Sequence, residues 1–516
     1  MVFSLRSLAA VSALAPLVVG TNTTTTVNSI NSVITSLKSV NYGTSFGSTC
    51  ACDLLSLVLG KQSVLFPGST NYTTQATHYY TTRVDLSPKC VFVPNSVNDV
   101  AIGVVILDVC QSNFAIRGAG HMPVLAAANT DGGVLVAMSS FTDITLSRDK
   151  TTVDVEPAAD WYQVNVALEP YGLTAIGGRL KTIGVAGLTL GGGISYFAAK
   201  YGFAMDNVAA YQVVLASGEV VTASASSNSD LFWALKGGGN NFGIVTKFTL
   251  LVYPLPSVST AIISYGQDAI PAWVSAVADF ANYQDQVDTN AGGIFDIGYT
   301  PGVGFAPLFM GVQSGNTVQP AVFSNFSAIP NQFSSYNVTS LAYWSSTIDT
   351  PYQQARWVFG MHSMVADNSS MQEMYNIFAA ACPEMDSIDG FTITLTYQPL
   401  PKSAFAVAAT NGIGNTWGLD DTKNYVFWLL SVGWANQSDD NTVMSWGKSL
   451  REKMHSSNIA KGTAESFMYM NDSADDQDAI GSYPKASISK LQSIRRKYDP
   501  TLVFTNLVTG GFKVPV

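Results

Sequence analysis

A short stretch, residues 113–123 (NFAIRGAGHMP), holds the residue types best suited to cofactor chemistry. Its apolar residues 114–116 predict a buried strand, and the small residues that follow predict a tight loop. Small residues let backbone N–H groups approach a phosphate closely, and Arg117 adds a charge-assisted donor. His121 stands at the exit of this loop and is one of four histidines in the chain. The stretch predicts a phosphate-cradling loop with a histidine beside the bound cofactor.

A second glycine-rich stretch covers residues 177–193 (GGRLKTIGVAGLTLGGG). Glycines that punctuate small apolar residues indicate a backbone passing close to something else. Two interpretations stay open on the pattern alone: a loop that surrounds a ligand, or tight packing between two layers. A third run, residues 237–245 (GGGNNFGIV), leads into the apolar strand TKFTLLVYPL.

Composition narrows the class of protein. A chain of 516 residues with 47% hydrophobic residues supports a large core divided over two or three lobes. The net charge of −10, without a Lys/Arg cluster, argues against nucleic-acid binding. Cysteine and histidine spacing predicts no metal site.

The N-terminus predicts export. Residues 1–20 combine Arg6, a short apolar run and Gly20, which is the pattern of a cleaved signal peptide; a core helix or a membrane anchor is the alternative, and the run is short for a span. No later stretch is long and apolar enough to span a bilayer. N-glycosylation sequons begin at Asn22, Asn71, Asn325, Asn337, Asn368, Asn436 and Asn471. We expect a secreted glycoprotein.

In an oxidising compartment the five cysteines predict at least one disulfide. We expect Cys50 or Cys52 to pair with Cys90. Cys110 lies in an apolar run and is interpreted as a buried thiol.

The order of elements predicts an α+β protein. Up to residue 255, short strands alternate with helices. Residues 256 to about 465 alternate longer helices (270–283, 371–381, 441–455) with extended runs, which predicts an antiparallel sheet with helices on one side.

Taken together, RGAGH, KTIGVAG…LGGG, YGFAMDNV, DLFWALKGGGNNFGIVTKF and KYDPTLVF resemble the FAD-linked oxidases of the vanillyl-alcohol-oxidase superfamily. The chain is most similar to the berberine-bridge-enzyme-like branch and its secreted fungal members. This resemblance implies a bipartite fold, with a PCMH-type FAD-binding domain over residues 21–255 (core about 86–255). It also implies a substrate domain over 256–465 and a segment, 466–516, that returns to the FAD-binding domain.

The resemblance also implies cofactor contacts. His121 matches the histidine that relatives bond to the flavin 8α-methyl carbon. The other matching positions are Arg117, Gly118, Ala119, Gly120, Thr182, Gly184, Val185, Gly187, Gly192, Ile244 and Val245. Some relatives carry a second link through a cysteine, whose position here is Leu180, so we expect a single covalent link through His121.

The catalytic base expected in relatives is missing. Many have a strand reading Tyr-x-Asn-Tyr, where this chain has Tyr469-Met470-Asn471-Asp472; others have a glutamate where this chain has Phe427. Three interpretations stay open: Asp472 is the base, with a pKa raised by desolvation; Tyr469 is the base; or the reaction needs little proton abstraction. Asp472 as an ordinary solvent-exposed strand end is the structural alternative. Tyr397 and Gln398 match a strand that faces the flavin and are expected to orient substrate, or else are ordinary sheet residues.

We expect a monomeric, secreted FAD-dependent oxidase that transfers a hydride from a small organic substrate, a secondary metabolite, to FAD. Dioxygen is the expected acceptor, giving H2O2, although Ile183 stands where relatives that admit oxygen have Val. The alternatives are an oligosaccharide oxidase and a non-redox flavin-holding cyclase or ligand-binding protein.

Overall fold

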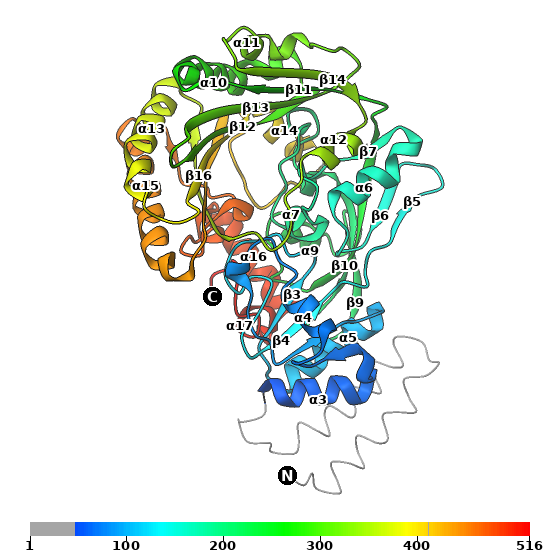
Figure 1. Ribbon diagram of the computed structural model, residues 1–516. Helices are drawn as coiled ribbons and strands as arrows, with labels where there is room; N and C mark the ends of the chain where they lie inside the picture. Colours follow the sequence, from blue (N-terminus) through cyan, green and yellow to red (C-terminus); the bar gives the residue numbers. More distant parts are fainter. Residues whose placement is uncertain (1–46, 411) are drawn as a thin grey trace, which may run out of the picture.

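Three β-sheets with flanking helices make up the computed structural model, which describes residues 47–410 and 412–516 (Figure 1). The expected signal peptide, the Asn22 sequon and any helix before residue 47 lie outside the described residues. The prediction of an α+β fold with antiparallel sheets is confirmed.

The first sheet carries the strand that precedes His121. Its order is β1-β2-β4-β3, with β3 and β4 parallel. The side chains of Val134–Ala137 (β4) are all buried, as expected of a central strand covered on both faces. The elements of this part are α3 (Gly47–Leu59), β1 (Val64–Leu65), α4 (Thr70–Ala76), β2 (Cys90–Phe92), α5 (Val97–Val109), β3 (Phe114–Arg117) and β4 (Val134–Ala137).

Two disulfides fasten α3, one to strand β2 and one to the end of helix α5. Cys52 pairs with Cys90, which confirms one of the two expected pairings. Cys50 pairs with Cys110, so the interpretation of Cys110 as a buried thiol is wrong. The reason is the packing of α3 against α5, which brings the end of α5 to Cys50. Cys382 is the free, buried cysteine among the described residues.

The second sheet has the order β5-β6-β10-β8-β9, and β7 pairs with β10. The long strand β10 (Ile244–Pro254) pairs antiparallel with β6, β7 and β8. The glycine-rich stretch 177–193 is not a loop throughout, because it contains the short helix α7 (Val185–Leu190). The elements are β5 (Ile144–Leu146), β6 (Thr152–Val155), α6 (Trp161–Leu168), β7 (Leu173–Ala175), α7 (Val185–Leu190), α8 (Ala198–Tyr201), β8 (Val208–Val214), β9 (Val220–Ser224), α9 (Ser229–Leu235) and β10.

The third sheet is an eight-stranded antiparallel sheet of order β14-β11-β13-β12-β16-β17-β15-β18. Helices α10, α13 and α15 lie along one side of it (Figure 1) and share a core with its strands. The elements are β11 (Val258–Ser264), α10 (Ile270–Val287), β12 (Ala291–Thr300), β13 (Gly304–Ser314), α11 (Ser324–Ser327), β14 (Phe333–Thr339), α12 (Leu341–Thr347), β15 (Arg356–Val365), α13 (Asn368–Ala381), β16 (Thr392–Leu400), α14 (Lys402–Thr410), β17 (Tyr425–Trp434), α15 (Asp440–Ala460) and β18 (Ala464–Glu465).

The C-terminal segment runs back to the first two sheets. Helix α16 (Lys485–Tyr498) is followed by α17 (Val503–Asn506), and Phe114 N donates to Leu507 O at 2.8 Å. Tyr483 OH also donates to Gly237 O at 2.7 Å. The expected late strand around Tyr469 is instead a single 3₁₀ turn, Met470–Asp472. The domain boundaries at 255 and 466 stay predictions.

Candidate functional site

The two glycine-rich stretches meet face to face. A Cβ on Gly184 would lie 2.6 Å from the Cβ of Ala119, and a Cβ on Gly118 would lie 2.7 Å from Pro157 O. Gly120 has a φ of +79° and would meet His78 O at 2.3 Å. These contacts require glycine, because a real Cβ does not approach so closely. The open choice for the second stretch is thus partly settled: at Gly184 it packs against another layer.

Gly187 differs from these packed glycines. It is exposed, and a Cβ there would meet nothing within 4 Å. Gly118, Ile183 and Ala186 also keep accessible surface, whereas Thr182 and Val185 are buried. An accessible backbone beside the first turn of α7 fits a phosphate-bearing cofactor such as FAD.

His121 is held by aromatic and hydroxyl neighbours. The Tyr80 ring stacks on its ring at 4.5 Å, and its Nε2 lies 3.3 Å from Thr350 Oγ1. Thr350 in turn contacts the hydroxyl of Thr182 at 2.5 Å. Burial lowers the pKa of His121 from 6.5 to about 4, so the ring is neutral at physiological pH. A neutral imidazole has the free lone pair that a nucleophile needs.

Arg117 has a different role from the expected phosphate donor. Its guanidinium is 1% exposed, donates to Gln75 O and Gln75 Oε1, and lies over the Tyr79 ring. A buried guanidinium must be paired, and the acceptors on residue 75 satisfy two of its nitrogens. The expectation that Arg117 donates to a phosphate is therefore not supported, and the side chain fixes the loop from behind.

The other expected cofactor residues lie on two elements. Val185 begins α7 and Gly192, at φ +124°, follows it; a Cβ on Gly192 would meet the Trp417 ring at 2.0 Å. Ile244 and Val245 begin β10, where they pair with Val214 and Val213 and are buried.

Tyr469 fixes the second glycine-rich stretch. Its hydroxyl accepts from Gly193 N at 3.2 Å, Ile194 N at 3.3 Å and Asn471 Nδ2 at 2.8 Å. Burial raises the pKa of this phenol well above its usual value of 10. With its oxygen engaged by N–H donors and its proton held firmly, Tyr469 is unsuited to proton abstraction.

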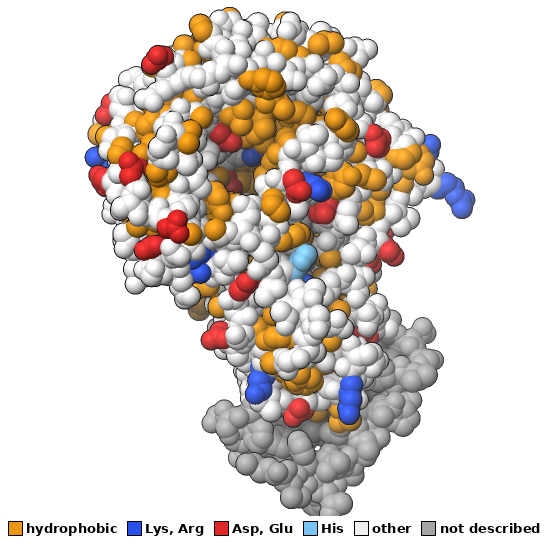
Figure 2. Space-filling model, viewed as in Figure 1, with side chains coloured by type: hydrophobic (Ala, Val, Ile, Leu, Met, Phe, Trp, Pro, Cys, Tyr) orange, Lys and Arg blue, Asp and Glu red, His pale blue; other side chains and the backbone are white. Residues whose placement is uncertain are grey.

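Asp472 belongs to a row of polar side chains that joins its 3₁₀ turn to strand β16 and to the loop between β7 and α7. Its Oδ2 accepts from Gln398 Nε2 at 2.6 Å, and Gln398 Oε1 accepts from Arg179 Nη2 at 2.5 Å. Arg179 Nη1 also donates to Gly293 O at 3.1 Å. Figure 2 shows the molecule hollowed near the third sheet, with charged side chains in the depth of the hollow.

Arg179 determines the polarity of this row. A guanidinium has donors only, so the carbonyl of the Gln398 amide faces Arg179 and its NH2 group faces Asp472. Asp472 Oδ2 is thereby an acceptor, which stabilises the carboxylate form. Burial raises the pKa of Asp472 from 3.8 to about 6, with the Gln398 hydrogen bond and the Arg179 charge opposing it. A carboxylate with this pKa is ionised at pH 7 and basic enough to accept a proton.

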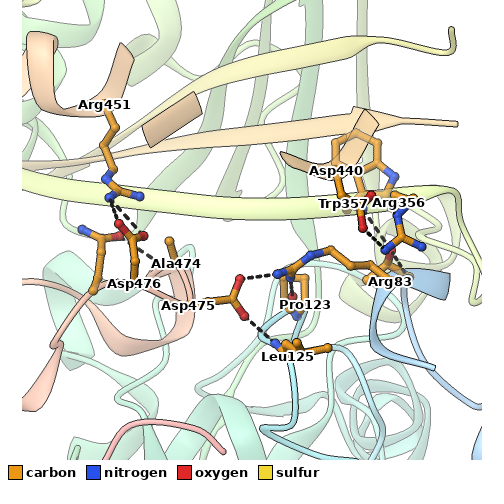
Figure 3. A network of polar contacts seen from close by, with 12 residues as sticks. Arg83, Pro123, Leu125, Arg356, Trp357, Asp440, Arg451, Ala474, Asp475 and Asp476 are labelled. Carbon is orange, nitrogen blue, oxygen red and sulfur yellow. Dashed lines mark hydrogen bonds and ion pairs between the residues drawn. The ribbon is translucent and has the colours of Figure 1, made fainter. Parts of the chain in front are cut away.

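The turn that carries Asp472 is tied to the loop that carries His121. Arg83 donates to Pro123 O at 2.8 Å and pairs with Asp475 at 2.5 Å, as Figure 3 shows. Asp475 also accepts from Leu125 N at 2.6 Å, and on the other side Asp476 pairs with Arg451 at 2.9 Å. These contacts hold the segments after His121 and after Asp472 in one fixed arrangement.

Tyr397 does not face this site. Its ring is fully buried near Trp273 on the helix side of the sheet, and its hydroxyl donates to Met371 O at 2.9 Å. Successive strand residues point to opposite faces, so placing Gln398 toward Asp472 turns Tyr397 away. The expectation that Tyr397 orients substrate is wrong, whereas Gln398 contacts Asp472 directly. Phe427, opposite Gln398 on β17, packs with Phe467 and Tyr469.

Sequence reasoning missed Arg179 and Thr350. Arg179 stands with Lys181 inside a glycine-rich run, and a charge among glycines and small apolar residues is a usable signal for a side chain with a fixed partner. Thr350 carries no signal of its own, because it reaches His121 from 229 residues away. Among residues 47–410 and 412–516 no cluster of three or more His, Cys, Asp or Glu is placed to bind a metal. Nor does any described helix have the length and apolarity to cross a membrane.

Comparison with known proteins identifies related sequences. Residues 88–224 match the family described as "FAD binding domain". The "FAD-dependent monooxygenase prx3" of Penicillium roqueforti is 31% identical over 473 residues, covering 88% of this chain and 91% of its own. The "Bifunctional solanapyrone synthase" of Alternaria solani is 31% identical over 469 residues, covering 91% and 90%.

Solved structures share the fold at lower identity. Glucooligosaccharide oxidase from Acremonium strictum superposes with a TM-score of 0.72 at 18% identity, covering 91% of this chain and 99% of that one. A moss protein, "Physcomitrella patens BBE-like 1 wild-type", gives a TM-score of 0.70 at 20% identity, covering 88% and 96%. At these identities the comparison establishes the fold alone.

Proposed function

Because the chain belongs to the fungal FAD-dependent oxidoreductases and shares the fold of a berberine-bridge-enzyme-like protein, we propose that it is an oxidase for a small organic secondary metabolite. In this proposal FAD is held covalently through His121 alone, Asp472 is the catalytic base, and dioxygen is the terminal acceptor, giving H2O2. The observation that carries the proposal is the Gln398–Asp472 hydrogen bond, oriented by Arg179.

The cofactor is assigned to the two facing glycine-rich stretches. Gly118, Ala119 and Gly120 on one side, with Thr182, Gly184, Val185 and Gly187 on the other, would line it, and Gly192, Ile244 and Val245 would complete the site. Bound FAD would supply the acceptor for a substrate hydride. His121, neutral and stacked on Tyr80, would supply the nitrogen for a covalent link. Leu180, in the position of the cysteine of doubly linked relatives, supports a single link.

Asp472 is proposed to take the proton of a substrate hydroxyl or amine. Gln398 occupies one carboxylate oxygen, Oδ2, which leaves Oδ1 for substrate. Tyr469 is excluded from this role by its engaged hydroxyl. Loss of the proton to Asp472 raises the electron density at the adjacent carbon, and this favours departure of the hydride.

The oligosaccharide-oxidase alternative is supported by the fold of solved oligosaccharide oxidases, which superpose well. It is disfavoured by two residues of this chain, Leu180 and Asp472, which replace the second link and the tyrosine base implied for that branch. The non-redox alternative is disfavoured because Asp472 is oriented and has a pKa suited to proton transfer.

Anaerobic reduction of the purified protein separates these functions. We expect an aromatic secondary alcohol or a benzylic amine to bleach the flavin absorbance, with H2O2 formed when air is admitted. Bleaching by cellobiose alone would overturn the proposal in favour of the oligosaccharide oxidase. No bleaching by any of the three, with flavin bound and dithionite still able to reduce it, would favour the non-redox function.

Secretion of a monomer is part of the proposal. It is supported by the leader-like residues 1–20, by the sequons and by the two disulfides, which form in oxidising compartments. Asn471 is an exception among the sequons, because its amide donates to Leu188 O and to Tyr469 and is unsuited to carry a glycan. Recovery of protein from culture medium that begins near residue 21, and that runs as a monomer in gel filtration, is the expected result.

A further inference from the structure

The segment of residues 348–354, which connects α12 to strand β15 of the third sheet, lies across the loop that carries His121. We call it the strap. Lys181 N donates to Ile348 O at 3.2 Å, and the Lys181 ammonium pairs with Asp349 at 3.0 Å. At the other end Gln353 N donates to Tyr79 O at 2.8 Å and Gln354 N to Tyr80 O at 2.9 Å. The strap is therefore fixed on both sides of Thr350.

Thr350 closes a short chain of hydroxyls that ends on His121. The Thr182 hydroxyl lies 2.7 Å from Thr350 O and 2.5 Å from Thr350 Oγ1, and Thr350 Oγ1 lies 3.3 Å from His121 Nε2. Each hydroxyl has one hydrogen to donate, whereas a backbone carbonyl only accepts. The direction of the chain follows from these two facts.

The carbonyl of Thr350 takes the hydrogen of the Thr182 hydroxyl. Thr182 Oγ1 must then accept the hydrogen of Thr350 Oγ1, which leaves that oxygen free to accept from His121. His121 Nε2 is thus the protonated nitrogen, and Nδ1 carries the lone pair. The Tyr80 ring, stacked on the imidazole at 4.5 Å, holds the plane of the ring.

We propose that Thr350 and Thr182 are positioning residues that hold His121 in its Nε2–H tautomer and so make Nδ1 the nitrogen that bonds to the flavin. This inference rests on the proposed covalent link through His121. Forming the link replaces one C–H bond of the 8α-methyl group by a C–N bond. The methyl hydrogen and the Nε2 hydrogen leave as protons, and the two electrons reach dioxygen, which becomes H2O2. The Thr350 hydroxyl faces the Nε2–H that must be lost.

The test compares covalent flavin in the full-length chain and in matched variants. Thr350→Val keeps the shape but removes the hydroxyl, and Thr350→Ser restores the hydroxyl. Thr347→Val is the control, because its hydroxyl only donates to Trp344 O within α12. We expect Thr350→Val to bind flavin while attaching it at least tenfold more slowly, measured as in-gel flavin fluorescence after denaturation. Thr350→Ser and Thr347→Val should attach flavin as the wild type does.

Thr182→Val gives a second, smaller effect. Without the Thr182 oxygen, the Thr350 hydroxyl can turn its hydrogen toward Nε2, so both tautomers become populated and attachment slows several-fold. Equal attachment rates in Thr350→Val and the wild type, with His121→Ala wholly unlinked, would overturn the positioning role of Thr350 and Thr182. The link through His121 would stay intact.

A wild type with only dissociable flavin would instead refute the link. In that case ¹⁵N-histidine NMR, which reports the tautomer of His121, tests the role of the two threonine hydroxyls by itself. The chain has four histidines, so His121→Ala identifies the resonances of residue 121. A hydrogen on Nε2 in the wild type that shifts toward Nδ1 in Thr350→Val supports the positioning role of the threonines. A hydrogen on Nδ1 in the wild type overturns it.

Discussion

The site has two polar clusters, one around His121 and one around Asp472, and burial shifts the pKa values of these two residues in opposite directions. Burial lowers the pKa of His121 to about 4 and raises the pKa of Asp472 to about 6, so in both cases it favours the neutral form. For the imidazole the neutral form is the reactive nucleophile. For the carboxyl group the neutral form is useless as a base.

The neighbours of each cluster match this difference. His121 has an aromatic ring and two threonine hydroxyls around it, which direct a hydrogen without adding charge. Asp472 has Gln398 and, behind it, the Arg179 cation, which both lower its pKa against the effect of burial. The histidine cluster thus depends on desolvation, whereas the neighbours of Asp472 protect its carboxylate from the same effect.

The largest effect is expected at the catalytic end. Asp472→Asn removes the proton acceptor while keeping the size of the side chain, so anaerobic flavin reduction by a substrate found in the panel above should slow at least tenfold, on the order of 10²-fold. Covalent flavin content should stay at the wild-type level, because His121 is untouched. Asp421→Asn, which changes an exposed carboxyl group in the same way, is the control. An unchanged reduction rate would remove Asp472 from the mechanism.

A smaller effect is expected when the protection of Asp472 is removed. Gln398→Leu deletes the donor that stabilises the carboxylate, so the pKa of Asp472 should rise and the acidic limb of the rate profile should move up by about one pH unit. The loss of rate should be several-fold at pH 6 and should vanish at pH 9. Arg179→Met should move the limb the same way by less. A uniform loss at every pH would show that these residues bind substrate instead.

The smallest effect is on stability. Asp472 has a pKa of about 6 in the folded protein and 3.8 as an unperturbed group, so the folded state keeps a proton that the unfolded state has released. Stability from this group is complete below pH 3.8 and is lost as pH rises through 6. Asp472→Asn should therefore stabilise the protein at pH 8 by up to about 3 kcal/mol and leave it unchanged at pH 3.5. Denaturant unfolding at the two pH values measures this, and a variant less stable at pH 8 would contradict the raised pKa.

The two clusters also differ in how far the sequence could predict them. The first cluster is built around local stretches, so the RGAGH loop, its histidine and the glycine run could be predicted with their positions. Even there the sequence misassigned Arg117, because burial and its pairing with Gln75 depend on a segment 42 residues away. Thr350 could not be predicted, since the strap that carries it lies 229 residues from His121 in the sequence.

The cluster around Asp472 depends on which segments the fold brings together. Arg179, Gln398 and Asp472 come from a loop, a strand and a 3₁₀ turn that only the folded chain brings together. Gln398 and Asp472 were predicted by similarity, but Tyr397 was placed on the wrong face, because the alternation of a strand does not state which residue faces inward. The Cys50–Cys110 pairing was not predicted either, because it depends on the packing of α3 on α5.

The most direct measurement is a mass spectrum of the tryptic peptide 118–148, released between Arg117 and Arg148, from the secreted protein after acid precipitation. We expect this peptide to carry the flavin on His121 and no other peptide to carry it. A yellow supernatant with an unmodified 118–148 peptide, or flavin on another peptide, would contradict it.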